Sequence, residues 1–191
     1  VHELLEEMRE VAPDAQIDMI EGNHEYRLLR HLAEASPAIR AVLSDIHGMT
    51  VGSLLGLDKY EVRYIARGDL AAWTKGDINR EVRKNYEVYF DTFLVDHFPD
   101  GIRRGLSGVN GHHHQFEARS FYSELRGPCQ WFQLGCGHRR TASYCDGQKW
   151  NMGFMLTHID TERHNVAMNY IPLLDHAEVG GKFYFRSDDE R

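Results

Sequence analysis

A short apolar run that passes directly into an amphipathic segment constrains the fold of this chain more than any other feature. Residues 16–21 (QIDMIE) have the length and composition of a buried strand. Residues 25–36 (EYRLLRHLAEAS) repeat leucine at helical spacing, and the helix they predict ends at a Ser-Pro pair. The polar sequence GNHE, at 22–25, lies between the two. An amide and an imidazole where a strand meets a helix suggest a metal site at the mouth of a sheet.

The remaining segments predict an α+β fold. Helices and strands are mixed in the first half, and a run of antiparallel strands separated by Gly, Asp or Pro turns follows. We expect further helices within residues 1–15 and 51–57, and further strands within 60–66, 91–98, 106–109, 119–125, 129–135, 150–160, 164–174 and 182–187. A hairpin turn is expected at 160–163, and residues 68–90 have no clear pattern. We interpret residues 1–191 as one domain without an internal boundary.

Composition limits the classes of function. The chain has 191 residues, of which 42% are apolar, and no apolar run has the roughly 18 residues that a membrane span needs. We therefore expect no membrane partner and a cytoplasmic location. The net charge of −7 argues against binding nucleic acid by charge alone. An acidic protein that handles phosphates needs positive charge from elsewhere, and metal ions supply it.

The three cysteines lie close together in the sequence. Cys129, Cys136 and Cys145 are odd in number, which fits a reducing compartment better than a disulfide framework. Together with His138 they suggest a zinc knuckle, but the spacing matches none of the common paired patterns. Buried or incidental thiols are the favoured interpretation.

Three polar groups follow strand-like runs. They are Asn23-His24, then His97, then the run Gly111–His114 (GHHH). Imidazole nitrogens and an amide oxygen suit borderline divalent metals such as Mn, Fe(II) or Zn. His112 and His114 alternate, so on an extended loop they point to the same side and can serve two metals. Twelve histidines make some chance clustering inevitable, but three groups in this order favour a metal site.

These motifs resemble those of the calcineurin-like metallophosphoesterases, in particular of phage and bacterial members. GNHEYRL, a strand ending in His, and SGVNGHHHQF carry the resemblance, and SLLGLD, WFQLGCGH and WNMGFMLTHID extend it over nearly the whole chain. The resemblance implies stacked mixed β-sheets flanked by helices, with the metal site on loops at the strand ends. It implies a bacterium or a phage-infected host as the source. It also implies two divalent ions (Mn, Fe, Zn or Ni) and hydrolysis of phosphomonoesters or phosphodiesters, nucleotides or nucleic acids among them.

The resemblance assigns roles residue by residue. Asn23, His97 and His112 would ligate the second metal, and His114 would ligate the first. His24 would act near the phosphate as an acid or a transition-state stabiliser.

Two charged residues after His24 are ambiguous. Glu25 and Arg27 can orient His24 and bind the substrate phosphate, or can be ordinary helix-surface charges. For Arg27 the second interpretation is favoured, because charged side chains are common on helix surfaces.

The chain departs from the family pattern before Gly22. The family's Asp-x-His and Gly-Asp-x-x-Asp motifs, which supply most ligands of the first metal, are absent from the 21 residues there. LSDIHG and ARGDL offer Asp45, His47 and Asp69 in a rearranged order, but Ala72 stands where the last Asp should be. We therefore favour an N-terminally truncated domain that lacks its first βαβ unit, in agreement with a helical pattern that is already under way at Val1.

The middle histidine also departs from the pattern. The family usually has Gly after this His, whereas Phe98 follows His97 here. The strand context favours His97 as the ligand, and His47 is the alternative.

Three functions stay open at this point. The first is a two-metal phosphoesterase in the full-length protein. The second is a degenerate module that binds a metal or a partner, such as a separate N-terminal half or another copy of the chain. The third is nucleic-acid binding through the aromatic strands SFYSEL and KFYFRS. The acidic balance disfavours this last function, since aromatic residues more often pack a sheet.

Overall fold

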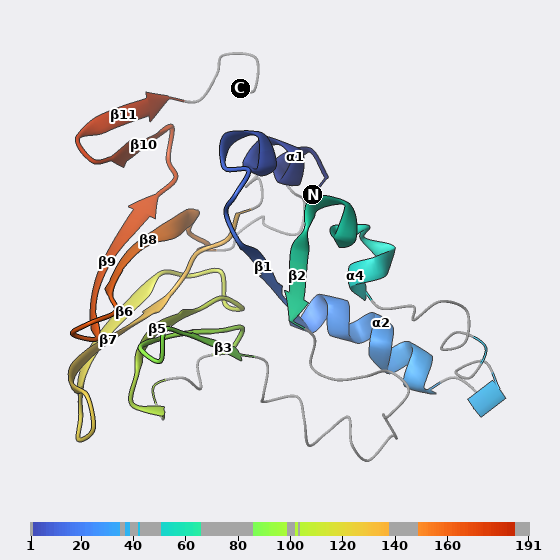
Figure 1. The fold of residues 1–191 in the computed structure, drawn as a ribbon, viewed down its shortest axis with the longest axis horizontal. Coiled ribbons are helices and arrows are strands. Elements are labelled where there is room, and N and C mark those ends of the chain that lie inside the picture. The colour runs from blue at the N-terminus through green and yellow to red at the C-terminus, as the bar shows by residue number, and fades with distance from the viewer. Residues whose placement is uncertain are drawn as a thin grey trace. The chain divides into compact units, whose positions relative to one another are not determined.

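The computed structural model describes residues 2–34, 37–38, 42, 51–65, 86–98, 102, 104–137 and 149–185. These residues form several β-sheets and few helices, which confirms the prediction of an α+β fold (Figure 1). Contacts group the chain into two compact units, Val1–Tyr86 and Glu87–Arg191, and each is described by itself below. The single domain over residues 1–191 stays a prediction. Within the described ranges, no helix is long and apolar enough to cross a membrane.

The first unit is built around two parallel strands. Strands β1 (Ile17–Ile20) and β2 (Val62–Ile65) pair in register along their whole length. Parallel strands need a crossover connection, and this crossover contains α2 (Asn23–Glu34), α4 (Val51–Leu54) and the 3₁₀ helix η1 (Leu57–Tyr60). Helix α1 (His2–Val11) precedes β1. The helices and strands predicted for this region are therefore confirmed, with small differences at their ends.

Apolar packing and one ion pair hold β1 against β2. Leu5 of α1, Leu57 and Val62 form the buried cluster of this unit. Asp18 and Arg63 lie opposite each other in the strand register, and the guanidinium donates two hydrogen bonds to the carboxylate at 2.9 and 2.6 Å. A bidentate pair has a fixed geometry, so it favours this register over a shifted one.

The second unit contains a mixed five-stranded sheet. Its strands are β3 (Tyr86–Tyr89), β4 (Phe93–Asp96), β5 (Ser107–Asn110), β6 (Glu117–Ser123) and β7 (Gly127–Gln133), in the order β3-β4-β5-β7-β6. Strand β5 runs parallel to both β4 and β7, whereas β6 and β7 form an antiparallel hairpin. Because β4 and β5 are parallel neighbours, the residues that follow them meet at one edge of the sheet.

Two antiparallel hairpins complete this unit. Strands β8 (Gly153–Asp160) and β9 (Asn165–Pro172) form one, and β10 (His176–Val179) and β11 (Lys182–Phe185) form the other. The β8–β9 turn covers residues 161–164, one position beyond the prediction. The sequence pattern misses β3, which ends the stretch 68–90 without a clear pattern, and β10 (HAEV), in which only Val179 has a high strand propensity.

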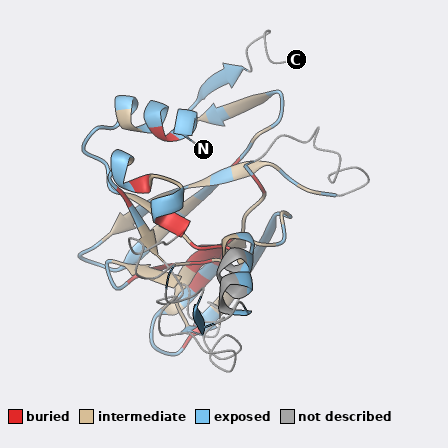
Figure 2. Ribbon diagram, turned by 90° about the vertical axis from the view of Figure 1, so that its right-hand side faces the viewer, coloured by how far each residue is buried: buried red, intermediate tan, exposed pale blue. Residues whose placement is uncertain are grey.

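The core of the sheet lies where β4, β5 and β7 pack closely (Figure 2). Leu94 and Trp131 are almost fully buried. Between them lies Gly108, where a Cβ atom would stand 2.1 Å from the Leu94 carbonyl oxygen and 2.7 Å from the Trp131 ring. Only glycine allows this close packing, which holds the centre of the sheet rigid beneath the loops at its edge.

Candidate metal centre

The structure brings His97 and His112 together. Asp96 and Asn110, the last residues of β4 and β5, lie opposite each other in the parallel register. The chain leaves both strands at the same edge, and His97 Nε2 lies 3.1 Å from His112 Nδ1. The two rings meet edge to face, with centroids 4.9 Å apart. Two imidazole nitrogens from residues 15 positions apart thus converge on one point.

Asp96 and Phe98 fix the orientation of His97. The Asp96 carboxylate is buried and accepts a hydrogen bond from the backbone N–H of Phe98 at 3.0 Å, which holds His97 at the centre of a tight turn. The Phe98 ring contacts the rings of His97 and His112, at centroid distances of 4.8 and 4.5 Å. Phe98, which departs from the family pattern, therefore forms an apolar wall beside both imidazoles.

The loop that carries His112 is strained. His112 has a φ of 77°, and His113 N–H donates to the Gly111 carbonyl at 3.1 Å, which closes a three-residue turn around it. Such a γ-turn with positive φ is rare, and His114 also has a positive φ of 58°. Each of these conformations costs on the order of 1 kcal/mol or more in a non-glycine residue. Gly111 has no positive φ, and a Cβ there would meet only His97 Nδ1, at 4.0 Å.

The Asn110 side chain stabilises this strained loop through hydrogen bonds. Its side chain is buried, and its amide donates to the Gly111 carbonyl at 2.7 Å. Its side-chain oxygen accepts from the indole N–H of Trp131, also at 2.7 Å. Sequence reasoning missed Asn110 and Asp96 because both are buried only once the sheet forms. For Asp96 the available signal was a polar residue directly before the strand-end His97.

His114 lies in a separate environment. Its ring stacks on Trp150, with centroids 4.5 Å apart, and its carbonyl accepts from Asn151 N–H at 2.9 Å. Asn151 in turn accepts a hydrogen bond from Phe116 N–H at 2.9 Å. Across the part of the chain that the structure describes, no three His, Cys, Asp or Glu side chains gather as a metal site. The described centre is thus a histidine pair with His114 on the same loop.

Tyr170 supports the segment that carries Trp150. Its hydroxyl donates to the Met152 carbonyl at 3.2 Å, and its ring stacks on Phe116 with centroids 4.0 Å apart. Burial, and then the nearby Cys136, raise the pKa of Tyr170 above its usual range. The hydroxyl therefore stays protonated at neutral pH and continues to donate its hydrogen bond to the Met152 carbonyl.

Asn23 and His24 occupy the first turn of α2, in the first unit, directly after β1. The carboxylate of Glu25 accepts a hydrogen bond from the backbone N–H of Gly22 at 3.0 Å. This contact is half of a capping box, in which the third helical residue satisfies the N–H of the cap residue. Glu25 thus stabilises the helix start, while His24 and Arg27 are exposed.

The remaining predicted ligands fall into two groups. Asp45, His47, Asp69, His138 and Cys145 lie outside the described residues, as does Ala72. Cys129 and Cys136 are buried thiols that form no disulfide among the described residues, in agreement with the favoured interpretation. The metal roles of Asn23, His97, His112 and His114 and the substrate role of Arg27 stay predictions. No protein-family model, curated protein or solved structure matches this chain.

Proposed function

We propose that this chain belongs to a metal-dependent phosphoesterase with the mixed-sheet architecture of the calcineurin-like metallophosphoesterases. The observation that carries the proposal is the distance of 3.1 Å between His97 Nε2 and His112 Nδ1, on loops that follow two parallel strands. Metal ligands of such enzymes come from loops at strand ends, and these two histidines come from such loops.

The spacing of the two nitrogens fits a shared cation. Two imidazole nitrogens about 2.0–2.1 Å from one ion, at the angles of octahedral or tetrahedral coordination, lie about 2.8–3.4 Å apart. The observed 3.1 Å falls within this range. A hydrogen bond between the rings explains the distance equally well. The strain at His112 favours the cation, because a simple ring contact gives no reason to keep a costly turn.

The chain's residues then have distinct tasks. His97 and His112 would hold one divalent ion (Mn, Fe, Zn or Ni), and His114 would contribute to a second. When bound, two such ions polarise the phosphoryl oxygens and supply a hydroxide near neutral pH. Phe98 excludes water from one side of the histidine pair, and Asp96 and Asn110 keep the two loops in place.

Substrate recognition would fall to the start of α2. A helix N-terminus presents free backbone N–H groups and a partial positive charge, both of which favour a phosphate. His24, exposed in the first turn, can donate a proton to the leaving alkoxide. Arg27, on the same helix, can pair with the phosphate of a nucleotide or nucleic-acid phosphoester.

A second candidate is a degenerate metal-binding or partner-binding module without catalytic activity. It is favoured by the absence of a three-ligand acidic or histidine cluster among the described residues. In this case the histidine pair would hold a single structural ion, or the chain would pair with a separate N-terminal half that carries the missing carboxylates.

Metal content and hydrolysis, measured together, test the proposal. Because this chain lacks most ligands of the first metal, the full-length protein would be purified, analysed for bound metal by mass spectrometry and assayed with p-nitrophenyl phosphate and its diester in the presence of Mn²⁺. We expect about two ions per chain for the enzyme and one or none for the module. His112→Ala should lose metal and activity, whereas His24→Ala should keep metal and lose about 10²-fold or more in rate.

His158→Ala is the matched control, because His158 is exposed on β8 and has no role in the proposed site. It should keep both metal and activity. Full activity in both His24→Ala and His112→Ala would exclude the phosphoesterase. Hydrolysis that survives complete metal removal would exclude it as well.

A further inference from the structure

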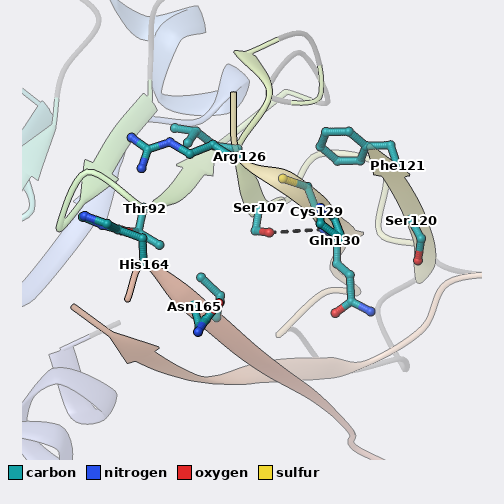
Figure 3. Close-up of a pocket in the computed structure, with 12 residues that line it drawn as sticks. Thr92, Ser107, Ser120, Phe121, Arg126, Cys129, Gln130, His164 and Asn165 are labelled. Carbon is teal, nitrogen blue, oxygen red and sulfur yellow. Dashed lines mark hydrogen bonds between the residues drawn. The ribbon is translucent and has the colours of Figure 1, made fainter. Parts of the chain in front are cut away.

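A second candidate site lies at the opposite end of β4 and β5 from the histidine pair. A pocket of about 360 Å³ opens where Thr92 and Leu106 lead into these two strands. It is enclosed by residues of β6, β7 and the start of β9 (Figure 3). Its volume is at the lower end of the range for small-molecule sites. Because both sites lie in the second unit, their separation along β4 and β5 is a property of one compact body.

One end of the pocket is polar. The Arg126 guanidinium donates to the Asp91 carbonyl at 3.0 Å, and His164 Nδ1 lies 2.8 Å from Thr92 Oγ1. Since Asp91 and Thr92 are neighbours, these contacts hold the guanidinium and the imidazole at the same end. Figure 3 shows this end separated from Ser120 and Phe121 at the other.

The Thr92 hydroxyl determines how His164 is presented. A threonine has one O–H donor, and Thr92 uses it on the Phe90 carbonyl at 2.7 Å. Thr92 Oγ1 therefore accepts from His164 Nδ1–H. This leaves Nε2 as the atom that can meet a ligand, as an acceptor when neutral and a donor when protonated.

Strained backbone conformations also occur at the polar end of this pocket. Six described non-glycine residues have a positive φ: Glu61, Phe90, Asp91, His112, His114 and His164. Two of them belong to the histidine loop, and three form the turns that present Thr92, the Asp91 carbonyl and the His164 ring. Thr92 N–H donates to the Tyr89 carbonyl at 3.0 Å, so Phe90 and Asp91 occupy a tight hairpin turn in which Asn-Gly would be less strained. Strain of this kind tends to gather where function requires it.

The residues that line the pocket indicate the chemical class of ligand that it can bind. Among the described residues that line the pocket, Arg126 supplies a positive charge and none is acidic, although the chain as a whole carries −7. The Ser107 hydroxyl accepts from Gln130 N–H at 3.2 Å, so its own hydrogen is available to a ligand. Leu106, Phe121, Pro128 and Val166 form an apolar part of the wall, and Ser120, Gln130 and Asn165 add further polar groups to the lining.

We infer that this pocket binds a phosphorylated small molecule. Arg126 and His164 hold the phosphate at the polar end, and the organic part lies on the apolar wall. This site is independent of the proposed metal centre, since it shares no residue with it.

Binding of AMP to the intact chain tests the inference. Calorimetry in EDTA would compare AMP, adenosine and inorganic phosphate, so that binding through metal ions does not contribute. We expect saturable AMP binding, weaker binding of phosphate and none of adenosine. Arg126→Gln should weaken AMP binding about tenfold or more, because a charge-assisted hydrogen bond is lost. His164→Asn should also weaken it, while asparagine still tolerates the positive φ.

Arg119→Gln is the matched control, because Arg119 lies on β6 of the same sheet, pairs with Glu117 and does not line the pocket. It should leave AMP binding unchanged. His112→Ala should also leave AMP binding unchanged, because His112 belongs only to the proposed metal centre, and a loss of metal in that variant would not bear on this pocket. Equal losses in Arg126→Gln and Arg119→Gln would overturn the inference, since they would show a general effect of charge. Equal binding of adenosine and AMP, or no saturable AMP binding, would also overturn it.

Discussion

The indole N–H of Trp131 donates a hydrogen bond of 2.7 Å to the side-chain oxygen of Asn110, and both residues are buried. Trp131 belongs to the core of the sheet, whereas Asn110 is the last residue before the strained histidine loop. The contact therefore links the buried core of the sheet to the loop that carries His112. Such a link supplies a stable support for a conformation that is unfavourable by itself.

Removal of the Asn110 side chain should destabilise the protein. Asn110→Ala deletes the bonds to Trp131 and to the Gly111 carbonyl, and it leaves a buried indole donor unpaired. We expect the free energy of unfolding to fall by about 1–3 kcal/mol, measured by urea denaturation. The exposed Asn169, on β9, is the control, and Asn169→Ala should change stability by less than about 0.5 kcal/mol. Equal effects of the two substitutions would show that Asn110 does not support the loop.

Gly108 should tolerate no side chain. In Gly108→Ala the new Cβ would stand 2.1 Å from the Leu94 carbonyl oxygen, which is backbone and cannot move without disrupting the β4–β5 pairing. We expect a loss of about 3 kcal/mol or more, seen as a lower thermal midpoint or a failure to fold. Gly137→Ala is the matched control, since a Cβ there meets nothing within 4 Å. A stable Gly108→Ala variant would contradict the close approach of the two strands.

Phe98 should affect metal binding without touching the metal. Its ring contacts both imidazoles, so Phe98→Ala frees them to rotate and admits water. We expect the affinity for Zn²⁺ or Mn²⁺ to fall about tenfold or more, measured by calorimetry. Leu125→Ala, at a side chain that is 90% exposed, should leave the affinity unchanged. If Phe98→Ala bound metal as tightly as the wild type, the orientation of the histidines would depend on other contacts.

The β8–β9 hairpin should weaken in acid. Hydrogen bonds from the backbone N–H and then the guanidinium of Arg163 lower the pKa of Asp160 in the folded state. Stability from this carboxylate is therefore present above its unfolded pKa of about 3.9 and is lost as the pH falls through the lower folded value. An NMR titration of the Asp160 carboxyl should give a midpoint below about 3.9. A midpoint at or above that value would show that the turn does not bind the carboxylate.

Local pattern was sufficient for most of the secondary structure. The alternation of residues 164–174 predicted β9, and the leucine spacing after Glu25 predicted α2, because each signal lies within one element. The pattern failed for β3, which lies in a stretch without clear alternation, and for β10, which has one residue of high strand propensity and is placed by its pairing with β11. The burial of Asp96 and Asn110 escaped notice for a similar reason, since a polar residue becomes buried only when distant strands cover it.

The candidate site divides in the same way. The sequence by itself determined which residues can bind a metal, since the GHHH motif and the histidine after a strand-like run can be recognised from the order of the residues alone. Only the tertiary structure decided that His97 and His112 meet, because this depends on the parallel pairing of β4 with β5. The pocket at the start of β4 and β5 could not be predicted from the sequence. Thr92, Arg126 and His164 are distant in sequence, and a long-range fold, which no local periodicity encodes, brings them together.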